Sequence, residues 1–204
     1  LDGKSMGEVR KLMYGKEGEA VELVIYRPEL DQHLKLVVKR ERLKNDTVEA
    51  EVLEVEGRKL GYITINLFGE KTAEEWKEAL DGVMKEEVEG LIIDVRDNPG
   101  GYLHSVAQMM SMFEQNEKTF AYMQNHEGAT ESLKTKTSEA FAPYAKQLSN
   151  MPITVLQNEG SASASEVFAG ALQDWKRGVV IGVTSFGKGT VQQTWDLQNG
   201  GEVK

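Results

Sequence analysis

The chain has 204 residues, 40% of them hydrophobic and 28% charged, which is typical of a globular protein and excludes the disordered and fibrous classes. Its formal net charge of -9 argues against a general nucleic-acid binder, because phosphate contacts need clustered Lys and Arg. It contains no cysteine, which excludes thiol nucleophiles, disulfides and Cys-ligated zinc.

No apolar run approaches the roughly 20 residues that a membrane-spanning helix needs, and no signal peptide is evident. The chain starts at Leu1 without a Met and stops at Lys204 within a predicted strand. We therefore expect a fragment of a longer protein, which would contact a membrane only through a segment absent from this chain.

Residues 1–43 are predicted to form a small α+β module. Apolar residues at helical spacing indicate a helix over residues 7–14, and two further patterns predict strands over residues 21–27 and 34–39. The succession from LDGKS to VELVIYR resembles the C-terminal half of a PDZ domain. The resemblance implies that the carboxylate-binding loop would lie before Leu1. Any other small α+β module is the alternative.

Residues 44–204 alternate between strand and helix patterns, which predicts an α/β core with helices covering the sheet. Thr72 is a candidate N-cap, with Glu75 as its capping-box partner. Residues 124–149 have no clear period and suggest a lid or an excursion. Strands are predicted within residues 42–58 and over 60–65, 91–95, 119–123, 153–156 and 179–183, and helices over 73–86, 103–113 and 165–177.

Residues 160–166 (GSASASE) place three hydroxyls at the start of the last predicted helix. Ser163 is a candidate N-cap with Glu166 as its capping-box partner, which is a purely structural role. A hydroxyl at this position also lies beside unpaired backbone N–H groups, which stabilise a developing oxyanion. The run is therefore compatible with a helix cap, a nucleophile or both.

A serine nucleophile needs a base, and the sequence offers two. His104 lies a few residues from Asp97, which would permit a Ser-His-Asp triad, although a lone His on a helix is more often packed or solvated. Lys188 lies between two glycines, after an apolar strand and Phe186. A dry environment there would favour the neutral amine, which can accept the serine proton. A solvated turn lysine is the ordinary alternative.

Residues 182–188 (GVTSFGK) fit the start of a P-loop, but Gly189 stands where Ser or Thr would hold magnesium. Residues 190–195 alternate like a strand, whereas a P-loop runs into a helix. Nucleotide binding is therefore disfavoured. No His/carboxylate cluster has metal-ligand spacing, so the sequence predicts no metal site.

Three motifs stand in one order: NPGG at residues 98–101, SASASE at 161–166 and TSFGKGTVQ at 184–192. The first follows a buried strand and reads as a turn whose glycine N–H can face a carbonyl oxygen. The combination resembles the carboxyl-terminal processing peptidases, or tail-specific proteases, over nearly the whole chain. The resemblance implies Ser-Lys catalysis on a core like that of Clp protease and crotonase, built of strand-strand-helix units.

By position, the resemblance implies that Ser163 is the nucleophile, Lys188 the general base and Gln192 the residue that orients the lysine. The oxyanion would bind the backbone N–H groups of Gly101 and Ala164. It further implies protein substrates bound through their C-terminal tails, no cofactor and an extracytoplasmic bacterial location, and it leaves open a homo-oligomer. A catalytically silent peptide-binding scaffold is the alternative.

Overall fold

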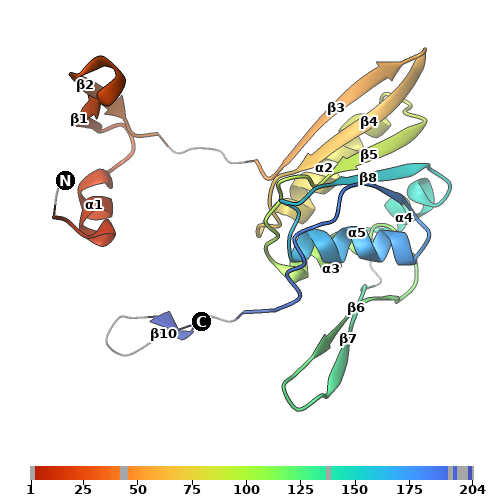
Figure 1. The fold of residues 1–204 in the computed structure, drawn as a ribbon. Helices are drawn as coiled ribbons and strands as arrows, with labels where there is room; N and C mark the ends of the chain where they lie inside the picture. The colour runs from red at the N-terminus through yellow and green to blue at the C-terminus, as the bar shows by residue number, and fades with distance from the viewer. Residues whose placement is uncertain (1–2, 42–45, 137–138, 193–194, 197–201, 204) are drawn as a thin grey trace. The chain divides into compact units, whose positions relative to one another are not determined.

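The computed structural model describes residues 3–41, 46–136, 139–192, 195–196 and 202–203. The chain divides into two compact units, Leu1–Asn45 and Asp46–Lys204 (Figure 1). Within the described ranges, no helix is both long enough and apolar enough to cross a bilayer.

The first unit contains the helix and the strand pair expected from the sequence. Helix α1 (Met6–Met13) begins with a capping box, in which Ser5 N–H donates to the Glu8 carboxylate at 2.8 Å and Glu8 N–H to the Ser5 hydroxyl at 3.4 Å. Strands β1 (Ala20–Arg27) and β2 (Gln32–Lys39) pair antiparallel around a one-turn 3-10 helix, Pro28–Leu30. The assignment of this first unit to a PDZ domain stays a prediction.

The second unit is built on a five-stranded mixed sheet with the strand order β3-β4-β5-β8-β9. Strand β3 pairs antiparallel with β4, and the other neighbours pair in parallel. The parallel strands therefore end at one edge of the sheet, where the loops that follow them gather. The strands are β3 (Val48–Val55), β4 (Arg58–Ile65), β5 (Gly90–Asp94), β8 (Ile153–Gln157) and β9 (Val179–Gly182).

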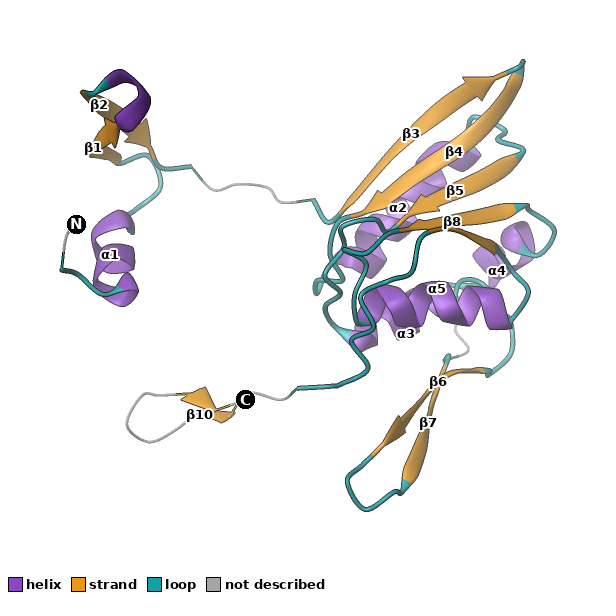
Figure 2. Ribbon diagram, in the orientation of Figure 1, coloured by secondary structure: helices purple, strands orange, loops and turns teal. Residues whose placement is uncertain are grey.

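The parallel strands β4, β5 and β8 are each followed by a helix, namely α2 (Thr72–Met84), α3 (Leu103–Met110) and α5 (Ala164–Asp174). Helix α3 contacts both α2 and α5, and Figure 2 shows α3 and α5 side by side. The rings of Phe68, Trp76, Phe113 and Phe168 meet between them, with centroids 5.8 to 6.3 Å apart in the contacting pairs. Burying each such ring contributes roughly 1.5–3 kcal/mol, which fixes α5 against the sheet.

Residues 124–149 hold structure that the sequence pattern did not reveal. Strand β6 (Thr119–Gln124) pairs antiparallel with β7 (Thr130–Lys134), and helix α4 (Ala142–Leu148) follows. Trp175 anchors the start of this hairpin, because its indole N–H donates to the Thr119 carbonyl at 2.9 Å. A lid function for this region stays a prediction.

The predicted capping box of α2 is wrong. The helix begins at Thr72 and its N-cap is Lys71, without a side-chain cap. The Thr72 hydroxyl instead accepts the N–H of Gly69 at 2.8 Å, and the Glu75 carboxylate accepts the N–H of Thr47 at 2.6 Å. Both side chains thus fasten the loops around α2. Glu75 cannot complete the local cap because its carboxylate is bonded to Thr47, 28 residues away.

Candidate active site

Ser163 lies in the turn between β8 and α5 and is the N-cap of the helix, as predicted. Its backbone has φ +58° and ψ −116°, a conformation that residues other than glycine rarely adopt. Such strain costs on the order of 1–3 kcal/mol and persists only where the surroundings impose it. The N–H of Ser163 donates to the Glu166 carboxylate at 2.6 Å, which is the return bond of a capping box.

The three hydroxyls of the serine run differ in their burial and hydrogen bonding. The hydroxyl of Ser161 is buried and donates to the Val95 carbonyl at 2.7 Å. That of Ser165 is also buried and donates to the Asn98 carbonyl at 2.9 Å. Ser163 is half-buried and lines an open cavity of about 670 Å³. Two of the three hydroxyls are therefore committed to backbone carbonyls.

Asn98 holds the glycine turn against the serine turn. The side chain is fully buried; its Nδ2 donates to the Ile65 carbonyl at 2.7 Å and its Oδ1 accepts the N–H of Gly100 at 2.8 Å. Its own carbonyl accepts the N–H of Ala162 at 2.9 Å. One residue thus joins the end of β4, the NPGG turn and the serine turn.

Gly100 and Gly101 have φ +102° and +138° and allow backbones to approach closely. A Cβ on Gly100 would lie 2.7 Å from the Ser163 Cβ, and one on Gly101 would lie 2.2 Å from the Phe68 carbonyl oxygen. Among the described residues, the N–H groups of Gly101 and Ala164 have no hydrogen-bond partner. The glycine turn and the serine turn, which meet at Gly100 and Ser163, thus each supply one free backbone donor.

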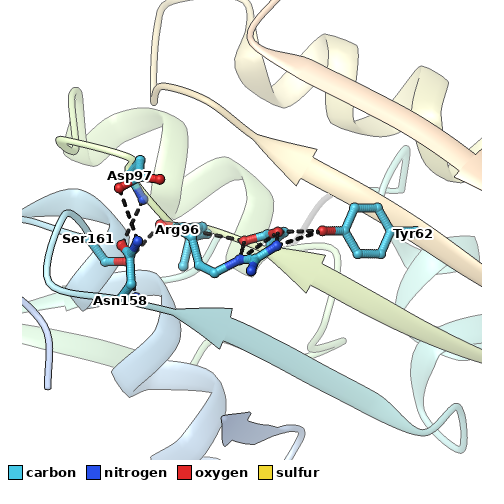
Figure 3. A network of polar contacts seen from close by, with 7 residues as sticks. Tyr62, Arg96, Asp97, Asn158 and Ser161 are labelled. Atoms are coloured by element: carbon cyan, nitrogen blue, oxygen red, sulfur yellow. Dashed lines mark hydrogen bonds and ion pairs between the residues drawn. The ribbon is translucent and has the colours of Figure 1, made fainter. Parts of the chain in front are cut away.

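A polar network at the end of β5 supports the glycine turn that follows this strand (Figure 3). The buried Asp94 carboxylate accepts Arg96 Nε at 2.9 Å and also accepts the Tyr62 hydroxyl. Burial has the largest effect on the pKa of Asp94 and raises it, but the hydrogen bonds from Arg96 and Tyr62 together lower it below its ordinary value. Next to it, Asp97 N–H donates to Asn158 Oδ1 at 2.8 Å. Sequence reasoning did not identify this network.

The candidate histidine triad is not assembled. The Asp97 carboxylate accepts Asn158 Nδ2 at 3.0 Å, and the His104 ring stacks on Tyr102 with centroids 5.1 Å apart. Within the part of the chain that the structure describes, no hydrogen bond joins His104 to Asp97 or to Ser163.

The Lys188 segment differs from its prediction. Lys188 is exposed and Phe186 is 69% exposed, so the expected dry environment is absent. Residues 190–192 form no strand either, because alternation alone does not supply a ladder partner, and residues 193–194 lie outside the described ranges. Short strands β10 (Trp195–Asp196) and β11 (Glu202–Val203) pair antiparallel beyond them.

The cavity nevertheless brings the predicted residues together. Gly101, Ser163, Lys188 and Gln192 all line it, and Ala164 directly follows Ser163. The Ser163 hydroxyl and the Lys188 amine are not hydrogen-bonded to each other in this structure. The apolar part of the lining comes from α3, α5, the β6–β7 hairpin and the lysine segment, and includes Leu103, Ala121, Leu133, Val167 and Val191.

Comparison with known proteins places the sequence in a family. Residues 59–204 match the profile of "Peptidase family S41". The "Carboxy-terminal processing protease CtpB" of Bacillus subtilis is 37% identical over 204 residues, which are 100% of this chain and 41% of that protein. A "Probable CtpA-like serine protease" of Staphylococcus haemolyticus is 36% identical over 202 residues, 99% of this chain and 38% of that protein.

A solved "Photosystem II D1 C-terminal processing protease" is 27% identical and superposes with a TM-score of 0.66, covering 99% of this chain and 53% of that one. The chain thus spans 41% and 38% of the length of the two curated relatives. The predicted family and the mixed α/β fold class are confirmed. This chain belongs to peptidase family S41.

Proposed function

We propose that this chain carries the catalytic centre of a serine endopeptidase that cleaves proteins near their C-terminus through a Ser163–Lys188 dyad. One observation carries the proposal: Ser163, Lys188, Gln192 and Gly101 line a single cavity. Two further observations support it. The other two hydroxyls of the serine run are buried and bonded, and Ser163 alone has the strained turn typical of exposed nucleophiles.

The proposed reaction proceeds in two steps. Lys188 takes the proton of Ser163, whose Oγ attacks the peptide carbonyl carbon, and the oxyanion accepts the N–H groups of Gly101 and Ala164. Each such donor stabilises the transition state by roughly 3–4 kcal/mol. Collapse expels the amine, which receives its proton from Lys188. Water then hydrolyses the acyl-enzyme with Lys188 as base again, and the Gln192 amide orients the lysine.

The surroundings of Lys188 suit a base. Four other lysines described in the second unit form ion pairs, whereas among the described residues no carboxylate pairs with the Lys188 amine. An ion pair would hold the amine in its protonated form. The cavity is open in the free protein, so a bound peptide would exclude water from the amine and favour the neutral form.

The substrate class follows from the lining and from the relatives. The cavity combines polar groups with a patch of apolar side chains that includes Leu103, Leu133 and Val167, and this patch suits an apolar side chain beside the cleaved bond. Relatives named for C-terminal processing support cleavage near a C-terminus. Tail recognition by the first unit as part of a PDZ domain, and an extracytoplasmic location, belong to the same proposal.

The test is cleavage of an unfolded protein by the complete enzyme beside its Ser163→Ala, Lys188→Ala and His104→Ala variants. We expect the first two to be inactive and the third to cleave like the wild type. If the wild type also fails to cleave but still binds C-terminal peptides, the silent scaffold is correct. If His104→Ala alone is inactive, a histidine replaces the lysine as base.

A further inference from the structure

The Glu166 carboxylate contacts both halves of the candidate site. It belongs to the first turn of α5, three residues after Ser163. Its Oε2 accepts the backbone N–H of Ser163 at 2.6 Å and that of Lys188 at 2.9 Å. Its Oε1 accepts the N–H of Gly187 at 2.6 Å and the Ser185 hydroxyl at 2.7 Å. One oxygen atom therefore joins the backbone of the candidate nucleophile to that of the candidate base.

The lysine segment has few other attachments. Residues 185–192 contain no helix or strand, and all but Ser185 are exposed. Among the described residues, their hydrogen bonds are the three to Glu166 and one from Phe186 N–H to the Ser161 carbonyl at 3.0 Å. The place of Lys188 beside the cavity thus depends mainly on one side chain.

We propose that Glu166 is a positioning residue, which sets the distance between Lys188 and Ser163 by holding the two backbones on one carboxylate. The inference rests on the proposed roles of these two residues. It goes beyond the helix cap expected from sequence, because three of the four donors come from residues 185–188 rather than from α5.

The chemistry of the group fits this role. An ionised carboxylate is an acceptor without donors, so it can satisfy four N–H and O–H groups at once. Burial has the largest effect on its pKa and raises it, but the hydrogen bonds from Ser185, Ser163, Gly187 and Lys188 together hold the pKa below its ordinary value. The charge is thereby directed at backbone donors, and the Lys188 amine is left without an ion pair.

Glu166→Gln is the informative change, because it keeps the shape and replaces one acceptor oxygen by an NH₂ donor. That NH₂ would face at least one backbone N–H, so either Lys188 or Gly187 loses its anchor. Displacement of a catalytic group by about 1 Å costs on the order of 100-fold in rate. We therefore expect kcat to fall about 100-fold in the complete enzyme, with KM changed less than about threefold.

Glu75→Gln is the matched control. Glu75 is also half-buried in the first turn of a helix and accepts the backbone N–H of Thr47 at 2.6 Å and its hydroxyl at 2.7 Å, away from the cavity. This variant is expected to lose stability without a change in kcat of the folded fraction. Ser185→Ala, which removes a single bond to Glu166, is expected to lower kcat only a few-fold.

The measurements are kcat and KM at a temperature where circular dichroism shows each variant folded, together with the pH dependence of kcat/KM. If Glu166→Gln misplaces the base, the acidic side of the pH profile of kcat/KM should shift along the pH axis. Loss of folded protein lowers kcat/KM equally at every pH and cannot produce such a shift. The inference would be overturned if Glu166→Gln kept the kcat and the pH profile of the wild type. If Ser163→Ala and Lys188→Ala were inactive in the same experiment, the proposed function would still stand. Full activity in Ser163→Ala or Lys188→Ala would overturn the proposed function itself.

Discussion

The two halves of the candidate site are built differently. The serine and glycine turns are buried in the fold, where Asn98, Ser161 and Ser165 are at most 1% exposed and bond to backbone from distant segments. The lysine segment is exposed and attached mainly through Glu166. The candidate nucleophile and the candidate oxyanion donors are thus held by the buried part of the fold, whereas the candidate base is attached to it mainly through the Glu166 carboxylate.

This difference separates two kinds of mutational effect. Truncation of the buried side chains Asn98, Ser161 and Ser165 removes hydrogen bonds that the fold itself needs, so it should lower stability. Changes in the lysine segment break few contacts of the core and should lower activity at nearly constant stability.

Among changes outside the proposed dyad, the largest effect on activity is expected from Gly101→Ala. The new Cβ would lie 2.2 Å from the Phe68 carbonyl oxygen at a φ of +138°, so the turn must move and its N–H with it. Loss of one oxyanion donor costs about 100- to 1,000-fold in kcat. Kinetics and thermal unfolding check this. Gly128→Ala is the control, because its φ is also positive at +84° but its Cβ would meet nothing within 4 Å.

Asn98→Ala is expected to be the most destabilising of the side-chain truncations. It leaves the Ile65 carbonyl and the Gly100 N–H unsatisfied in a buried place, at roughly 1–3 kcal/mol for each group. Urea denaturation should show a loss of about 3 kcal/mol in the free energy of unfolding. Asn125→Ala removes the acceptor of two N–H groups in an exposed turn and should lower the free energy of unfolding far less. Equal losses of stability in the two variants would contradict the view that the buried half of the site depends on Asn98.

The three serines of the run should differ in whether their removal lowers stability or activity. Ser161→Ala and Ser165→Ala each remove a buried hydroxyl bond and should cost about 1 kcal/mol of stability while retaining activity. Ser163→Ala should do the opposite, with activity lost and unfolding little changed. Paired kinetic and denaturation curves measure both quantities. Inactivity of Ser161→Ala or Ser165→Ala at full folding would contradict this assignment.

The smallest effect concerns acid stability. The pKa of Asp94 is below its ordinary value in the folded protein, so its stabilisation is present above the ordinary value of 3.8 and is lost as the pH falls below it. The stability difference between the wild type and Asp94→Asn should therefore narrow as the pH drops from 6 to 3. Denaturation at several pH values measures this; a constant difference would show that the charge of Asp94 is immaterial.

Local signals in the sequence were sufficient for much of the fold. The alternating patterns placed the sheet strands, and Ser163 with Glu166 predicted the start of α5, because caps involve residues three apart. The pattern missed β7, whose five residues include only one apolar side chain, Leu133, and the short helix α4. Such elements depend on packing against distant segments.

The candidate site also depends on contacts between distant segments, which the sequence does not reveal. The family resemblance predicted Ser163 and Lys188, but the hydrogen bonds of Ser161 and Ser165 go to carbonyls 66 and 67 residues away, which no local pattern reveals. The apolar strand before Lys188 suggested a dry environment, and yet nothing among the described residues covers that segment. The bonds from residues 185–188 to the Glu166 carboxylate were equally invisible, since they span 19 to 22 residues and join the first turn of α5 to a loop.

The most direct test of the account is covalent labelling of the complete protein with a fluorophosphonate, which reacts with a base-activated serine. Mass spectrometry of the digest locates the adduct among the three serines of the run. We predict modification of Ser163 in the wild type and none in Lys188→Ala. An adduct on Ser161 or Ser165, or undiminished labelling of Ser163 in Lys188→Ala, would contradict the Ser163–Lys188 dyad.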